Sequence, residues 1–298
     1  MRRAELSIEP EQWTVIEADL FAEDQQKFKM RKRAVLFLTL MILEGVIVVG
    51  FSIYQMATSK ETSLGSGVIF LLISLFIVYF GFDGVLNENK FELFSFTAAS
   101  FLFLLYGLNQ VFSPDIHRTI VFWVRFGCIA VMVPTNLALS FAVYRSFGWV
   151  IYRRIGADPT LQAMFKVFQV WTTLLKVDVF LGVIGVLMIG LFLFGGYELY
   201  IDIGFVVMTV LWAVACWFAA KQEVRWMMIA FFVFALVEPC YIVTKVIIVV
   251  VLKPSEYESL ELIGPVVVGV LALIVRVLLV VTGILVFRNF GKGLRQIQ

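Results

Sequence analysis

Residues 34–57 read AVLFLTLMILEGVIVVGFSIYQMA, a run of 24 residues in which Glu44 is the only charged side chain. About 20 apolar residues in helical conformation are enough to cross a bilayer hydrocarbon core of about 30 Å. A surface helix of a soluble protein would show a polar face, and this run has none. It therefore predicts a membrane-spanning helix, and the fold depends on how often the pattern recurs.

The pattern recurs seven more times along the chain. The eight predicted spans cover residues 34–57, 67–86, 91–112, 119–143, 167–194, 203–220, 226–252 and 264–287. Composition agrees with this, because apolar residues make up 61% of the chain and charged residues 15%, where a soluble domain has about 25% charged residues. We predict an all-α polytopic membrane bundle of eight helices, with a segment 1–33 before it and a tail 288–298 after it.

The basic residues predict the orientation of the bundle. Cytoplasmic segments of membrane proteins carry the excess of Lys and Arg. With the N-terminus inside, seventeen of the 24 basic residues fall in cytoplasmic segments and only Lys60, Arg118 and Lys253 fall outside. An odd number of spans would mix the two sets, so we expect both termini in the cytoplasm.

The segment 1–33 has the features of an amphipathic helix. Ser7 can cap its start, and Trp13, Ile16, Leu20 and Phe28 recur at helical spacing, with acidic residues early and basic residues late. The pattern predicts a helix that either lies on the cytoplasmic membrane surface or docks on the protein's own loops.

A long helical hairpin is predicted between the fourth and fifth spans. The helical pattern that starts at Thr119 continues to Ile155, and Asp158 and Pro159 begin a new helix whose 36 residues to Phe194 would measure about 54 Å. The hairpin would project into the cytosol with the basic residues Arg145, Arg153, Arg154 and Lys166. Positive-inside anchoring is the favoured explanation of this charge, and binding of an anionic lipid or a protein partner is the alternative.

Eight ionisable residues within the spans are singled out, and helical rise gives their depth. Asp83, Lys176 and Asp178 are expected near the inner face, where Asp83 can contact Lys176. Arg125 and Lys245 lie in the outer third, within reach of the outer interface. The depths place Glu44, Glu238 and Arg276 near the midplane.

These midplane charges form the candidate site. It combines four polar residues with two prolines that are predicted to kink their helices: Glu44, Glu238, Arg276 and Asn136, with Pro134 and Pro239. Broken helices beside acidic residues are common in transport sites. The favoured alternative is an ion pair of Arg276 with one or both glutamates that fixes helix packing, and a bound lipid or retinal-like ligand is a third hypothesis.

The sequence excludes several other classes of protein. His117 is the only histidine, the three cysteines lack metal-ligand spacing, and neither HExxH nor GxSxG occurs, so no catalytic, metal or cofactor residue is assigned and any cofactor is unknown. A net charge of +2 without a basic patch argues against nucleic acid as a partner. Membrane lipids are the expected surroundings, and the oligomeric state is not predicted.

One stretch of the chain resembles a known group. Its residues are Tyr152, Gly156, Ala157, Asp158, Met164, Gln169 and the run 174–178, LLKVD. With them, residues 148–178 resemble an uncharacterised group of multispan membrane proteins from eukaryotic microbes. The resemblance implies an eight-helix membrane fold and directs attention to Lys176 and Asp178, and it implies no chemistry.

The residues leave three functions open. The leading hypothesis is a channel or transporter for an ion, a proton or a small solute. The second is a non-catalytic scaffold or accessory subunit that binds a partner through the cytoplasmic hairpin. An intramembrane lipid-modifying enzyme is disfavoured, because no nucleophile and base or metal-ligand set is visible.

Overall fold

A computed structural model describes residues 10–58, 61–112, 120–147, 158–192, 197–247 and 259–292, and within these ranges the secondary structure is helical without strands. The elements are α1 (Pro10–Thr58), α2 (Glu61–Leu86), α3 (Lys90–Phe112), α4 (Ile120–Tyr144), the 3₁₀ turn η1 (Arg145–Phe147), α6 (Pro159–Phe192), α7 (Tyr197–Lys221), α8 (Arg225–Phe234), α9 (Val237–Ile247) and α10 (Ser259–Arg288). Eight stretches of the described residues are long and apolar enough to cross a membrane. The predicted all-α polytopic fold is confirmed.

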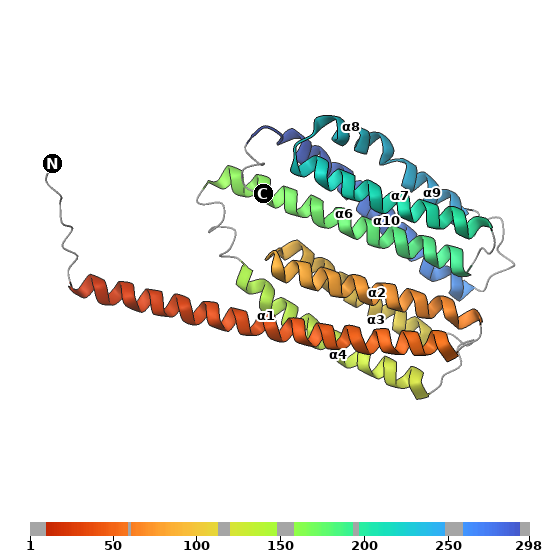
Figure 1. Ribbon diagram of the computed structural model, residues 1–298, viewed down its shortest axis with the longest axis horizontal. Helices are drawn as coiled ribbons and strands as arrows, with labels where there is room; N and C mark the ends of the chain where they lie inside the picture. Colours follow the sequence, from red (N-terminus) through yellow and green to blue (C-terminus); the bar gives the residue numbers. More distant parts are fainter. Residues whose placement is uncertain are drawn as a thin grey trace.

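The helices form two groups that lie side by side (Figure 1). In the N-terminal bundle, α1 packs against α2 and α4, and α3 packs against α2 and α4. In the C-terminal bundle, α6 packs against α10 and α7, with α8 and α9 outside them. Helix α6 also contacts α2 and α3, so it joins the two bundles.

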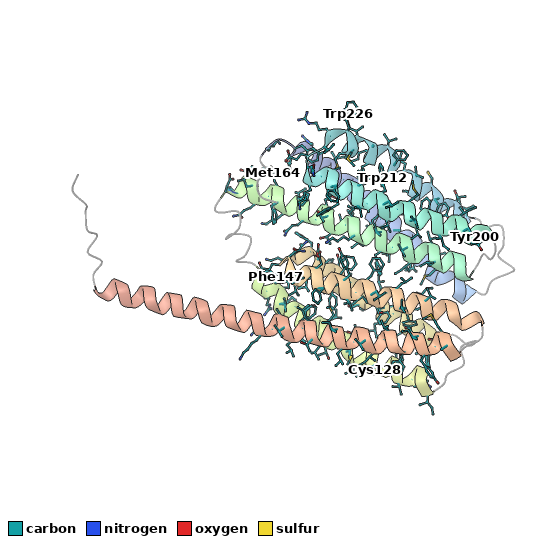
Figure 2. All side chains as sticks on the ribbon, in the orientation of Figure 1. Cys128, Phe147, Met164, Tyr200, Trp212 and Trp226 are labelled. Atoms are coloured by element: carbon teal, nitrogen blue, oxygen red, sulfur yellow. The ribbon has the colours of Figure 1, made fainter. Side chains whose placement is uncertain are left out.

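Each bundle has its own apolar core. Phe37, Phe70 and Phe96 lie in the N-terminal core, which extends onto α6 and α10, and Trp171 and Phe231 lie in the C-terminal one. Side chains also cover the outer faces of the helices (Figure 2), and many of these exposed residues are large and apolar. Such surfaces suit lipid, and within lipid the bundles are held by close packing and polar contacts rather than by exclusion of water.

Helix α1 corrects the prediction of a separate N-terminal helix. Its 49 residues run without a break from Pro10 to Thr58, and its first turns extend away from the bundle (Figure 1). The reason is local, since the run from Lys27 to Arg33 holds mostly strong helix formers and neither Gly nor Pro. The N-terminal segment therefore continues the first span, and Ser7 lies outside the described residues.

The structure describes part of the predicted hairpin between the fourth and fifth spans. Helix α4 ends at Tyr144 and is followed by η1, so the prediction of a helix from Thr119 to Ile155 is wrong. A 3₁₀ turn is a common way to tighten the end of an α-helix. Residues 148–157, with Arg153 and Arg154, lie outside the described part of the chain.

Helix α6 begins as the sequence predicts, with Pro159 at its first position. The Asp158 carboxylate accepts hydrogen bonds from the backbone N–H of Thr160 at 2.8 Å and of Leu161 at 3.4 Å. These bonds stabilise the charged carboxylate and hold the pKa of Asp158 below its usual range. The 34 residues of α6 measure about 51 Å, so the helix is longer than a bilayer core.

The seventh predicted span is divided at a proline. Helix α8 ends at Phe234 and α9 begins at Val237, because Pro239 has no N–H for the carbonyl of Ala235 and its ring crowds that carbonyl. By contrast, Pro134 lies inside α4, which is continuous from Ile120 to Tyr144.

Candidate functional site

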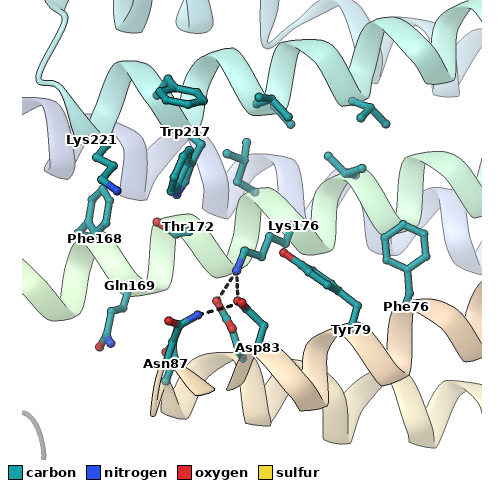
Figure 3. A pocket seen from close by; sticks show the side chains of 18 of the residues that line it. Phe76, Tyr79, Asp83, Asn87, Phe168, Gln169, Thr172, Lys176, Trp217 and Lys221 are labelled. Atoms are coloured by element: carbon teal, nitrogen blue, oxygen red, sulfur yellow. Dashed lines mark hydrogen bonds and ion pairs between the residues drawn. The ribbon is translucent and has the colours of Figure 1, made fainter. Parts of the chain in front are cut away.

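A cavity of about 620 Å³ lies where α2 and α3 of the N-terminal bundle face α6 and α7 of the C-terminal bundle (Figure 3). Its volume lies within the range of small-molecule sites. Its polar lining comprises Asp83, Asn87, Asn89, Glu92, Gln169, Thr172, Lys176 and Lys221. The end of α2, the start of α3 and the end of α7 meet here, so the cavity lies toward the membrane face that we predict to be cytoplasmic.

Three charged side chains meet in the wall of the cavity. The Lys176 ammonium on α6 makes ion pairs with Asp83 on α2 and with Glu92 on α3, the latter at 2.6 Å to Oε1 (Figure 3). We call Lys176, Asp83 and Glu92 the Lys176 site. The structure thus places Asp83 and Lys176 together, as their depths predicted, and adds Glu92, which the sequence reasoning did not include.

The Lys176 site is unbalanced in charge and in hydrogen bonds. Two carboxylates face one ammonium, which leaves a formal charge of −1. The Glu92 side chain is 2% exposed, and its Oε2 has no hydrogen-bond partner in the described structure. The hydroxyl of Thr172, one helical turn from Lys176, is also buried without a partner. Because a buried polar atom without a partner is costly, the site is suited to a ligand that donates hydrogen bonds.

The turn between α2 and α3 holds the two acids in position. Asn87 donates to the Asp83 carboxylate at 2.9 Å, and Asn89 donates to the Thr173 hydroxyl of α6 at 3.2 Å. Asn89 also caps α3, since its side-chain oxygen accepts the N–H of Phe91 at 3.1 Å. These contacts attach the α2–α3 hairpin to α6.

A glycine brings the two helices close together beside the acids. A Cβ atom on Gly84 would lie 3.1 Å from the backbone nitrogen of Leu93. The missing side chain lets α2 approach the first turn of α3. Asp83 and Glu92 can therefore reach the same ammonium group from two different helices.

A second buried pair lies on the same helix as Lys176. The Arg276 guanidinium on α10 pairs with Asp178 on α6 at 2.7 Å, and both side chains are less than 10% exposed. The sequence placed Asp178 near the inner face and Arg276 near the midplane, but their contact puts both at one level.

The predicted midplane set is divided in the structure. Glu44 on α1 accepts a hydrogen bond from the Asn136 amide on α4, and both residues are buried. Arg276 instead meets Asp178. The backbone of Glu238 belongs to α9, and its side chain lies outside the described residues.

The other predicted charges lie apart from the cavity. Arg125 donates to Gln55, and its guanidinium lies 4.2 Å from the Phe70 ring centroid. Lys245 is buried, with its ammonium 5.7 Å from the Tyr241 ring.

Two residues of the predicted basic hairpin are described. Arg145 covers the Phe141 ring at 4.6 Å, and Lys166 is exposed on α6.

Within the described residues no cluster of three or more His, Cys, Asp or Glu side chains could hold a metal ion.

Eight apolar helical stretches in two packed bundles, with charged side chains paired between the helices, define a multi-pass integral membrane protein. The chain is similar to a UPF0658 Golgi apparatus membrane protein of Schizosaccharomyces pombe, with 20% identity over 315 aligned positions and 89% of each chain covered. This similarity confirms the resemblance to an uncharacterised group of multispan membrane proteins of eukaryotic microbes. No family model and no solved structure matches the sequence.

Proposed function

We propose that this protein is a transporter that moves a small solute across a membrane through the cavity between its two bundles. The observation that carries the proposal is the Lys176 site, an unbalanced charge cluster in the wall of that cavity with Glu92 as its buried member. A charge kept inside a membrane protein without a full complement of partners is a mark of a pathway or binding site.

The position of the site supports transport by alternating access. Many transporters hold their substrate where two helical units meet, and one unit rocks against the other around the bound substrate. Here Asp83 and Glu92 belong to the N-terminal bundle, and Lys176 belongs to the C-terminal bundle. A rocking motion would change the distance between the acids and the base, so it could couple opening of the cavity to binding.

The extent of the cavity favours a carrier over a channel. Among the described residues its lining ends at Phe76 on α2, Val179 on α6 and Val210 on α7, which are apolar and lie about halfway along their helices. A channel would need a polar path that continues to the other face.

A scaffold is the second candidate function. Helix α1 extends well beyond the bundle (Figure 1), and such an extension is a suitable surface for a partner.

The similarity to the yeast protein supports the further proposal that this chain resides in the Golgi membrane.

Transport can be tested with the full chain in proteoliposomes. Flux of protons, monovalent cations, anions and small amines is measured for the wild type and for Glu92→Gln. The matched control is Glu44→Gln, a buried glutamate of the same bundle outside the cavity. We expect flux of at least one solute above protein-free vesicles. It should fall by about tenfold or more in Glu92→Gln, because a hydrogen bond to a charged group contributes about 1.5–3 kcal/mol.

Two outcomes would contradict the proposal. Flux no greater than in protein-free vesicles for every solute would reject transport and favour the scaffold. Equal loss of flux in Glu92→Gln and Glu44→Gln would reject the cavity as the transport site.

A further inference from the structure

We infer that the Lys176 site binds the ammonium group of a small organic amine and exchanges it for a proton. This inference rests on the proposed transport function and names the substrate class of the same site. It combines the charge balance of the cavity, its vacant hydrogen-bond positions and its apolar wall.

The titratable and charged groups that face the site come from all four helices around it. Helix α2 supplies Tyr79 and Asp83, α3 supplies Glu92, α6 supplies Lys176 and α7 supplies Lys221. Lys221 is exposed at the end of α7, where its ammonium lies 4.9 Å from the Trp217 ring, so water screens its charge. The remaining charges are the buried carboxylate of Glu92 with the partly exposed carboxylate of Asp83 and ammonium of Lys176, and one more positive charge makes this group neutral.

The vacant hydrogen-bond positions suit an ammonium group. Lys176 already takes Oε1 of Glu92, whereas Oε2 of Glu92 and the hydroxyl of Thr172 have no partner in the described structure. A primary ammonium carries three N–H donors. Both atoms are buried from the cavity, so an entering ammonium can donate to Glu92 Oε2 and to the Thr172 hydroxyl once these side chains turn toward it, with the third donor left for Gln169 or water.

The rest of the wall distinguishes an organic amine from an inorganic cation. Phe76, Val179, Val210 and Val214 give the cavity an apolar side that can hold a hydrocarbon substituent. The Tyr79 ring lies 5.5 Å from the Lys176 ammonium, so the aromatic part of the wall already accommodates a cation. A hard metal ion would need several oxygen ligands, and Lys176 occupies the position between the two carboxylates.

Charge balance links amine binding to a proton. Two carboxylates that share a single base, one of them buried, do not both remain charged, so the empty site carries a proton on one carboxyl group. An entering ammonium replaces that charge, and the proton leaves to water. Both occupied states are neutral, so either one can be carried through the membrane, and one amine is exchanged for one proton.

The test uses the purified full-length protein and 2-phenylethylammonium as the probe. Calorimetric titration in two buffers with different ionisation enthalpies gives both the affinity and the number of protons released. We expect release of close to one proton per amine in the wild type. The trimethylated analogue, which has no N–H donor, and the neutral alcohol should bind at least about tenfold more weakly.

Variants separate the charge from the hydrogen bonds. Glu92→Gln should weaken binding by about tenfold or more and abolish proton release, because a neutral amide removes the excess acid. Thr172→Val should weaken binding several-fold and leave proton release intact. Glu44→Gln should bind as the wild type does, which controls for loss of a buried carboxyl elsewhere.

The outcomes distinguish this inference from the proposed function. Amine binding without proton release, or equal binding of the alcohol, would overturn the exchange. If the vesicle assay shows flux of another solute and no amine binds, the inference fails and transport stands. If amine binds with proton release in a protein that moves no solute, transport alone fails.

Discussion

Lys176 and Asp178 are two residues apart on α6, yet they belong to two different kinds of charge cluster. Asp178 pairs with Arg276, and neither residue lines the cavity. Lys176 faces two acids, one of which keeps an oxygen without a partner, and the group lines that cavity. Charge balance and open space, rather than the mere presence of charge in a membrane helix, distinguish a structural pair from a candidate binding site.

The geometry of a helix explains how such different sites can be so close. Residues i and i+2 point about 200° apart around the helix axis, since each residue turns it by about 100°. Lys176 therefore points to α2 and α3, and Asp178 points to α10. One face of α6 contacts the N-terminal bundle, and the opposite face contacts the core of its own bundle.

The largest expected effect on stability is at the pair of Asp178 and Arg276. Asp178→Leu should lower the free energy of unfolding by about 3–5 kcal/mol, because it leaves the Arg276 charge buried without this partner. Reversible unfolding in mixed micelles measures the change.

The double variant Asp178→Leu/Arg276→Leu provides the control for that measurement. Removing both charges should recover about 2 kcal/mol or more of the loss, because no buried charge of this pair remains. If the double variant loses as much stability as Asp178→Leu and Arg276→Leu lose together, the pair is not a structural one and the contrast with the Lys176 site fails.

A much smaller effect on stability is expected at the Lys176 site. Glu92→Gln leaves Lys176 and Asp83 as a balanced pair, so the free energy of unfolding should change by less than about 1 kcal/mol. The same unfolding assay applies, with Lys176→Met as the comparison that leaves two acids facing each other and should cost more. A loss in Glu92→Gln as large as that in Asp178→Leu would make Glu92 a structural residue.

Much of the fold could be predicted from the sequence, because lipid imposes simple rules on length and composition. The eight apolar runs, the start of α6 at Pro159 and the interruption near Pro239 all follow from residue type and spacing. The end of α4 at Tyr144 and the continuity of α1 could not be predicted, since both depend on whether a helical pattern actually continues past the membrane boundary.

The site was harder to predict than the fold, because depth fixes only one coordinate. Depth placed Asp83 and Lys176 at one level, and the structure brings them together. It gave no information on helix rotation or on which helices are neighbours, so it grouped Arg276 with Glu44. Glu92 was missed because it lies in the first turn of α3, where an acidic residue is ordinary at a helix start.

The most direct test of the transport site is its accessibility from the two sides of the membrane. In a variant with Cys128, Cys216 and Cys240 replaced, Gln169→Cys places one thiol in the wall of the cavity. A membrane-impermeant trimethylammonium thiosulfonate is added either outside proteoliposomes or inside them. We predict labelling from both sides, with protection by 2-phenylethylammonium, because the two bundles would rock around the Lys176 site. Labelling from one side only, at a rate that the amine leaves unchanged, would contradict transport through the Lys176 site.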